Sequence, residues 1–373
     1  MDCLDLSDEC NVHCSKRILG GSALIVLSWL VGFLAVLANG IIIFKSVPTL
    51  TRCNTTVALI NKSLIIAISI GDLFVGCYLL IISFYDGIIF REDYCPKQIN
   101  WITSLECSKI SVLSTVGSQL SLFAMCGLSL TRIYGIYYSM RMPGEVNWLF
   151  VLKFVPILII MVISSLSIAV IPIVGKFQDF FVNGVNFEED LKVFIGTPNK
   201  QKISAVLESY YGRMLHTELS WKMIYKMVNE MYSHDFEYPD HTTKIPRVDF
   251  YGNDGVCLFK YFVKNDDPQR LFVWIILALN FVCFILITIS YLVIGYISQK
   301  LSNILAGSDT YGVISERNTK MNQRISIIIT TDFLCWIPFI MICLLHSLEV
   351  LDATPWYSVF SVIILPINSV INP

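Results

Sequence analysis

Seven long apolar stretches constrain the fold of this 373-residue chain more than any other feature. Each is long enough for an α-helix to cross the hydrocarbon core of a bilayer, which takes roughly 20 residues. The stretches are 20–44, 63–85, 107–137, 149–174, 271–297, 324–348 and 356–373. Only 15% of the residues are charged, which is too few to cover the apolar surface in water. The sequence therefore predicts an all-α fold, a seven-transmembrane helix bundle in a lipid bilayer.

The connections between the stretches predict the orientation of the bundle, because Lys and Arg are retained on the cytoplasmic side. The connections 45–62 and 298–323 are the basic ones, whereas acidic residues gather before the first stretch and in the opposite connections. We therefore expect a multi-pass membrane protein with its N-terminus outside. Two glycosylation sequons, at Asn54 and Asn61, then fall in the first cytoplasmic loop and are chance matches.

The predicted organisation is an extracellular N-terminal remnant, residues 1–19, followed by a seven-transmembrane domain, residues 20–373. The start of the chain suggests that an ectodomain has been lost, and its end falls inside the seventh helix. Residues 175–270 form a long, polar insertion in the second extracellular loop. Apolar residues in 202–232 recur at helical spacing and predict an amphipathic helix or a helical hairpin, which makes this loop partly helical. A solvated insertion without fixed structure is the alternative.

Charge and motifs favour neither an enzyme nor a nucleic-acid-binding protein. The net charge is −2 and the five histidines are scattered. No metal-spaced Cys/His cluster, nucleophile motif or glycine-rich phosphate loop is present in the sequence. We therefore expect no catalytic residues and no cofactor, apart from a sodium ion discussed below. A transporter, the rival class of membrane protein, would have repeated halves and broken helices, and the sequence has neither.

Polar side chains recur inside the apolar stretches, where burying them in lipid is expensive. They are Asn39, Asp72, Ser121, Arg132, Asp332, Asn368 and Asn372. Any one of them could simply join two helices by hydrogen bonds. As a set, they predict a polar switch in the interior of the bundle.

Asp332 is the acid that we expect to couple the sixth helix to the seventh. It lies four residues before Trp336, on the same helix face, and Pro338 favours a kink just beyond. Asn368 and Asn372 share a face of the seventh helix and can supply amide donors to the buried carboxylate. A polar contact without a switching role is the alternative.

The motifs that contain these residues resemble those of the rhodopsin-like G-protein-coupled receptors. They are Ala38-Asn39-Gly40, 69–72, Thr131-Arg132-Ile133, Cys335-Trp336-Ile337-Pro338 and Asn372-Pro373. Segments 250–258, 331–336 and 365–369 are similar to the leucine-rich-repeat-containing branch, which serves glycoprotein hormones and relaxin-like peptides. The resemblance implies a receptor for an extracellular peptide or protein hormone that signals through a heterotrimeric G protein. A degenerate receptor paralogue that no longer signals is the alternative.

The resemblance also implies a disulfide between Cys107 and Cys257, on the oxidising face of the membrane. Four further cysteines are expected outside and could form two more bridges, whose pairing stays open. They are Cys3, Cys10, Cys14 and Cys95. The remaining six are expected to be free thiols. They are Cys53, Cys77, Cys126, Cys283, Cys335 and Cys343.

By resemblance, Arg132 is the switch arginine that engages the G protein, and Tyr291 is the tyrosine that meets it in the active state. Thr131 stands where the family has an acid, and Asn318 stands where a second acid is frequent. We hypothesise that the inactive state is therefore held more weakly and that basal signalling is raised, unless Glu316 substitutes. The resemblance further implies a sodium-and-water pocket formed by Asp72, Ser121 and Asn368, in which a cation offsets the buried carboxylate.

Overall fold

The computed structural model describes residues 17–53, 55–91, 93–94, 97, 101–102, 104–139, 148–174, 251, 255–263, 269–305, 335–351, 353, 356–360, 362 and 365–371. Every regular element within these ranges is a helix. The predicted helix in 202–232 lies outside the described residues, as do Asp332, Asn372 and Pro373. Cys3, Cys10, Cys14 and Cys95 also lie outside them.

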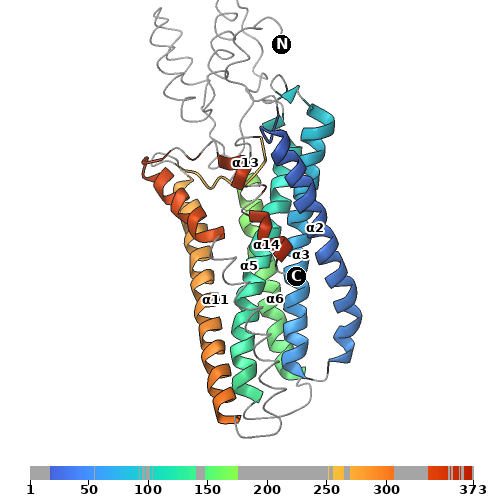
Figure 1. Ribbon diagram of the computed structural model, residues 1–373, viewed down its shortest axis with the longest axis vertical. Coiled ribbons are helices and arrows are strands. Elements are labelled where there is room, and N and C mark those ends of the chain that lie inside the picture. Colours follow the sequence, from blue (N-terminus) through green and yellow to red (C-terminus); the bar gives the residue numbers. More distant parts are fainter. Residues whose placement is uncertain are drawn as a thin grey trace, which may run out of the picture.

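Five long helices form the body of the molecule and run side by side along its long axis (Figure 1). They are α2 (Ser22–Ser46), α3 (Thr56–Phe84), α5 (Leu105–Ser139), α6 (Trp148–Val170) and α11 (Arg270–Leu305). Three continue into short helical turns, namely η2 (Val47–Arg52) after α2, the π-helical η3 (Tyr85–Phe90) after α3, and η4 (Ile171–Ile173) after α6. All five are long and apolar enough to cross a membrane, as the first five apolar stretches predict.

The first connection is shorter than the basic loop predicted over residues 45–62. Lys45 lies in α2, and α3 already begins at Thr56, so Asn61 and Lys62 are helical. The Thr55 side chain caps α3 by accepting a hydrogen bond from the Ala58 N–H at 3.3 Å, which lets the helix start before its apolar part. Asn61 is therefore a helix residue, and the prediction that its sequon lies in a loop is wrong.

The sixth and seventh predicted stretches are described in part. The sixth contains the helix Cys335–Ser347, and the seventh contains α13 (Tyr357–Val359) and α14 (Leu365–Ile371). All three lie against the same bundle, with α14 beside α2 and α3 (Figure 1).

Helix α5 is the central helix, with 78% of its most apolar window buried, against 22% for α6. Its contact with α3 depends on two glycines. A Cβ atom on Gly71 would lie 2.6 Å from the Gly117 carbonyl oxygen, and a Cβ on Gly117 would lie equally near the Gly71 carbonyl. The two backbones approach this closely because neither residue has a side chain.

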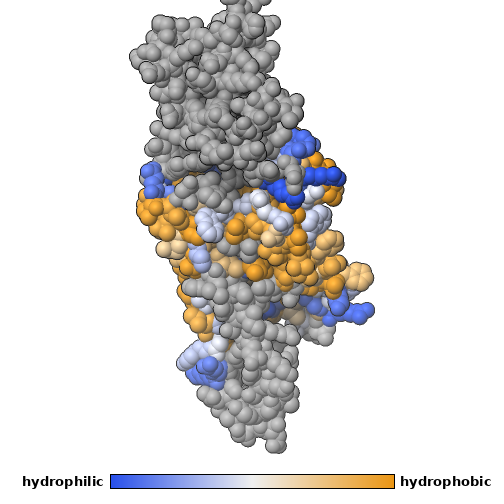
Figure 2. Space-filling view, turned by 45° about the horizontal axis from the view of Figure 1, so that its top comes forward, coloured by the Kyte–Doolittle hydropathy of each residue, from blue (hydrophilic) through white to orange (hydrophobic). Residues whose placement is uncertain are grey.

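The outer surface of the bundle is apolar. Large side chains such as Leu30, Phe44, Leu152 and Leu292 are exposed on three different helices. Figure 2 shows the apolar side chains gathered in a band across the molecule, with hydrophilic residues toward its margins. A band of this kind suits the hydrocarbon core of a bilayer.

Candidate functional site

The central helix α5 carries a candidate functional feature at each of its ends. Cys107 lies in its first turns and forms a disulfide with Cys257, whose Cα atom is 5.2 Å away. This is the pairing that the resemblance implies. Arg132 lies near the other end of the same helix, roughly 37 Å away at the rise of an α-helix. We call the two regions the disulfide end and the arginine end.

At the arginine end, α5 and α11 meet through Arg132 and Tyr291. The Arg132 guanidinium carbon lies 6.0 Å from the centre of the Tyr291 ring, at the outer range of a cation–π contact. Arg132 is half-buried, and no ion pair with an acid of the described residues holds it. Glu316 and Asn318 lie outside those residues. The structure thus brings together the arginine and the tyrosine that the sequence singles out.

Thr131 turns toward α3. Its hydroxyl donates to the Asn61 side-chain oxygen at 2.9 Å and also lies 3.1 Å from the Leu128 carbonyl. The residue that stands in place of an acid therefore bonds a neutral partner on the neighbouring helix. Sequence reasoning missed Asn61, because a glycosylation sequon in a basic segment gave no sign of an interhelical contact.

A chain of buried polar groups joins α2, α3 and α14 in the middle of the bundle. The Asn39 amide donates to the Ser369 carbonyl at 2.8 Å, and the Ser369 hydroxyl donates to Asp72 Oδ1 at 3.1 Å. All three residues are at most 3% exposed. Ser121 of α5 interacts with the same carboxylate. Asn39, Asp72 and Ser121 are among the predicted polar residues, whereas Ser369 was not singled out.

Three oxygen atoms on α2, α3 and α14 are buried without a hydrogen-bond partner among the described residues. They are Asp72 Oδ2, Asn368 Oδ1 and Asn39 Oδ1. The described residues contain no group of three or more His, Cys, Asp or Glu that could hold a metal. One carboxylate beside the hydroxyls of Ser369 and Ser121 is nevertheless a donor set that suits a hard cation, because such ions take oxygen ligands. The residues therefore fit the predicted ion.

Trp336 marks the described part of the sixth helix. Its ring lies 5.2 Å from that of Phe284 on α11 and 5.8 Å from that of Phe339, one turn along its own helix. Trp336 is buried, whereas Pro338 is exposed. Because Asp332 and Asn372 lie outside the described residues, the coupling of the sixth helix to the seventh through them stays a prediction.

The disulfide end is filled by segment 255–263, whose residues are all buried. Its start is fixed by the disulfide and by two hydrogen bonds to its backbone. The Tyr78 hydroxyl donates to the Val256 carbonyl at 2.7 Å, and the Trp101 indole N–H donates to the Gly255 carbonyl at 2.6 Å. Gly255 has a positive φ of 69°, which glycine adopts readily.

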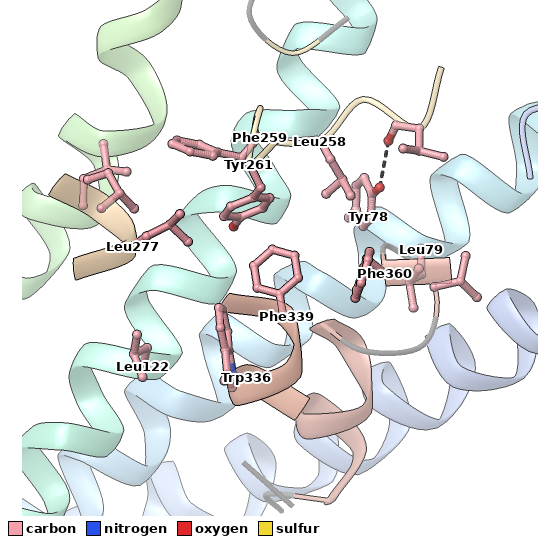
Figure 3. Packing of buried hydrophobic residues seen from close by; sticks show 14 of the residues in the cluster. Tyr78, Leu79, Leu122, Leu258, Phe259, Tyr261, Leu277, Trp336, Phe339 and Phe360 are labelled. Carbon is pink, nitrogen blue, oxygen red and sulfur yellow. Dashed lines mark hydrogen bonds between the residues drawn. The ribbon is translucent and has the colours of Figure 1, made fainter. Parts of the chain in front are cut away.

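The side chains of this segment pack into an aromatic cluster above Trp336 (Figure 3). The Tyr261 ring lies 4.9 Å from that of Phe339, and the Phe262 ring lies 5.7 Å from that of Phe360. Burial raises the pKa of the Tyr261 phenol above its usual range, so this side chain stays neutral. Residues 175–270 were predicted as one polar insertion, and for segment 255–263 that description is wrong, because its apolar run belongs to the core.

The six cysteines predicted as free thiols form no disulfide in the described part of the chain. Two of them, Cys126 on α5 and Cys283 on α11, lie close to one another. Cys283 stands where most receptors of the resembled family have a proline, and α11 is continuous through this position.

Residues 237–373 match the family described as seven-transmembrane receptor, rhodopsin family. The chain is similar to the G-protein-coupled receptor GRL101 of Lymnaea stagnalis, with 23% identity over 96% of this chain and 25% of that protein. It is 22% identical to a probable glycoprotein hormone G-protein-coupled receptor of Anthopleura elegantissima, over 100% of this chain and 31% of the relative. Relaxin receptor 2 of Canis lupus familiaris is 23% identical over 100% of this chain and 39% of its own length.

These relatives are much longer than the region they share with this chain. The chain spans between a quarter and two fifths of their length. What the alignments cover is the apolar bundle together with the segments that connect its helices.

Proposed function

Because the chain belongs to the rhodopsin family of seven-transmembrane receptors, we propose that it is a hormone receptor that signals through a heterotrimeric G protein. In this proposal, a peptide or protein hormone acts at the disulfide end, which faces the outside of the plasma membrane. The G protein binds at the arginine end, in the cytosol. The names of the relatives, a probable glycoprotein hormone receptor and a relaxin receptor, support the class of ligand.

The observation that carries the proposal is the contact between Arg132 and Tyr291. It joins α5 to α11 at the end of the bundle opposite the disulfide. A guanidinium without an ion-paired acid among the described residues can turn to the carbonyl groups of a partner, because its charge is permanent and its donors are fixed in a plane. This arrangement supports Arg132 as the residue that engages the G protein.

The disulfide end supports a ligand that acts from outside the bundle. Segment 255–263 and its aromatic partners fill the space among α3, α5, α11 and the helix Cys335–Ser347 (Figure 3). Because this buried segment already fills the mouth of the bundle, a ligand of protein size would act on this end from outside, without entering the bundle. Recognition over a broad surface also agrees with hormone ligands that are themselves folded chains.

A sodium ion belongs to the same proposal. Asp72 would hold it with Ser121 and Asn368, and the unpartnered Asp72 Oδ2 and Asn368 Oδ1 support this assignment. When bound, the cation supplies a positive charge that offsets the buried carboxylate. The residues themselves orient their oxygen atoms and join α3, α5 and α14.

Basal nucleotide exchange on a panel of purified heterotrimeric G proteins, measured with the full chain in lipid nanodiscs, tests the proposal. We expect the wild-type chain to accelerate exchange on at least one G protein. Arg132→Ala should lower the accelerated rate by about tenfold or more, because it removes charge-assisted contacts. Arg52→Ala, which removes an exposed arginine from η2, is the matched control and should leave most of the rate intact.

The outcome that contradicts the proposal is a wild-type chain that is folded in the bilayer and accelerates exchange on no G protein. That result would favour a receptor paralogue that keeps the fold and has lost signalling. Thr131 is the observation that gives this alternative its weight, since the family has an acid there.

A further inference from the structure

The three residues before Gly20 are seated in the disulfide end of the bundle. Ile18 is 4% exposed and Leu19 is fully buried. Gly20, with a φ of 74°, turns the chain so that α2 can begin at Ser22. The chain therefore reaches its first membrane helix through a buried junction and not across the surface.

The backbone of Ile18 bonds two elements that are far apart in the sequence. Its N–H donates to Asp86 Oδ1 at 2.7 Å, and its carbonyl accepts a hydrogen bond from the Ser358 hydroxyl at 3.4 Å. Asp86 belongs to η3, which continues α3, and Ser358 belongs to α13. One residue thus joins the end of the second membrane helix to the start of the seventh.

Asp86 is the stronger of the two anchors. Its side chain is fully buried and its second oxygen, Oδ2, has no hydrogen-bond partner among the described residues. The Leu19 N–H and the positive charge of the Arg17 guanidinium also favour the ionised form of this carboxylate. A buried carboxylate is costly unless peptide and cationic donors surround it, and bonds from such donors are short and strong. Within the described part of the chain, the donors that act on Asp86 come from Arg17, Ile18 and Leu19.

The π-helical turn explains how Asp86 comes to face the junction. A π-turn inserts one residue into a helix and rotates the residues that follow it. Asp86 is the second residue of η3, and the aromatic residues Tyr85 and Phe90 of the same turn pack against Trp101, with ring centres 4.5 and 5.3 Å away. The turn is held by its own packing, so the carboxylate is positioned before the junction binds it.

We propose that Ile18 is a tie between α3 and α13, with Asp86 as the positioning residue, so that displacement of the chain before residue 17 is transmitted to both helices. The tie itself is independent of the proposed receptor function. Its consequence for signalling rests on that function, because only a receptor would use such a link to pass movement from an extracellular segment to its helices.

Hydrogen exchange of the full chain in nanodiscs, read by mass spectrometry on peptides that cover residues 15–24 and 354–362, tests the tie. Asp86→Asn keeps the shape of the side chain and removes its charge. We expect it to speed exchange in 15–24 by up to about tenfold, because a charge-assisted hydrogen bond to the Ile18 N–H becomes a weaker, neutral one. Exchange in 354–362 should also rise. Ser358→Ala should raise exchange in 15–24 by a smaller factor, because its bond is longer.

Glu349→Gln is the matched control. Glu349 is an exposed acid just after the helix Cys335–Ser347, at the same end of the bundle, and its loss should change neither peptide. If Asp86→Asn opens 15–24 and leaves 354–362 unchanged, Ile18 does not link the two helices and the proposal is overturned. If Asp86→Asn fails to fold, Ser358→Ala decides alone, and unchanged exchange in 15–24 overturns the tie.

The signalling consequence has its own measurement, the basal nucleotide exchange of Asp86→Asn beside the wild type. A basal rate that changes by about threefold or more supports a role in signalling, whereas an unchanged rate in a wild type that does signal overturns that role. If the wild type itself activates no G protein, the proposed function fails, and hydrogen exchange still decides whether the tie exists.

Discussion

Thr131 shows how a single residue can set the resting state of the arginine end. Its hydroxyl bonds Asn61, and the neighbouring Arg132 lies over Tyr291 with no ion-paired acid among the described residues. We expect Thr131→Asp to lower basal nucleotide exchange by up to about fivefold, the effect of a partly exposed ion pair. The reason is that the new carboxylate would hold Arg132 away from the G protein.

Thr131→Val provides the control for this substitution, since it removes the bond to Asn61 without adding a charge. Basal exchange should then stay at or above the wild-type rate. An unaltered rate in Thr131→Asp would show that the missing acid does not determine basal activity.

Asp72 leads to a second prediction at this scale. If Asp72 binds sodium, the melting temperature of the purified chain should be higher in sodium chloride than in choline chloride at equal ionic strength. The rise follows from a ligand that binds the folded state alone. Asp72→Asn should abolish the difference, whereas Asn280→Ala, which changes another buried polar residue, should keep it. A sodium effect that survives in Asp72→Asn would place the ion elsewhere.

The polar residues of the bundle could be predicted from the sequence, but their partners could not. Asn39 and Asp72 stand out because amides and carboxylates are rare in apolar helices. Ser369 does not, because serine is common in such helices and its role depends on how α14 is rotated. Asp86 was read only as one of the outer acids, since no sequence pattern indicates that a backbone N–H 68 residues away will bond it.

At the scale of the helices, the two facing glycines of α3 and α5 predict an intolerance to a single methyl group. Gly71→Ala or Gly117→Ala would drive a Cβ atom to 2.6 Å from a carbonyl oxygen of the other helix. We expect either change to lower the free energy of unfolding by about 1–3 kcal/mol, the usual effect of overpacking. Thermal unfolding in detergent or nanodiscs would measure it as a lower melting temperature.

Gly40→Ala and Gly295→Ala are matched controls, because a Cβ atom at either position has no neighbour within 4 Å. Alanine has the higher helix propensity, so these two variants should be as stable as the wild type or slightly more stable. Equal melting temperatures for all four variants would mean that α3 and α5 can move apart without a loss of stability, and would contradict the prediction.

The centres of the helices could be predicted closely, and their ends could not. Apolar length determines which residues lie in lipid, but hydrogen bonds beyond the lipid determine where a helix begins. Helix α3 starts at Thr56 and not at 63, because Thr55 caps it and polar residues are tolerated in the turns outside the hydrocarbon. The π-turn η3 is likewise not visible in the apolar pattern.

For the whole molecule, the distribution of charge predicts which end is outside, and glycosylation can test it. A sequon added within residues 1–16 should be glycosylated when the chain is made in cells with an endoplasmic reticulum, because that side faces the lumen. Asn54 and Asn61 should stay unmodified, since the basic segment 45–62 that contains them is predicted to face the cytosol. If the wild-type chain instead carries a glycan, seen as a gain in mass that is lost in Asn61→Gln, the predicted orientation is wrong.

The all-α bundle could be predicted because apolar length and charge asymmetry are properties of the chain itself. That segment 255–263 fills the disulfide end could not be predicted from the sequence. Segment 255–263 follows a long polar insertion, and its burial depends on a disulfide to Cys107 and on a donor from Tyr78, 178 residues away. Long-range contacts of this kind emerge only when the helices are assembled.

The covalent attachment of segment 255–263 has a consequence for pharmacology. A freely diffusing compound that is to occupy this volume competes with a segment that never leaves the vicinity, so its apparent affinity is weakened by the rarity of the vacated state. Compounds found by screening should therefore bind beside the segment or on the lipid-facing sides of the helices, unless they first displace it.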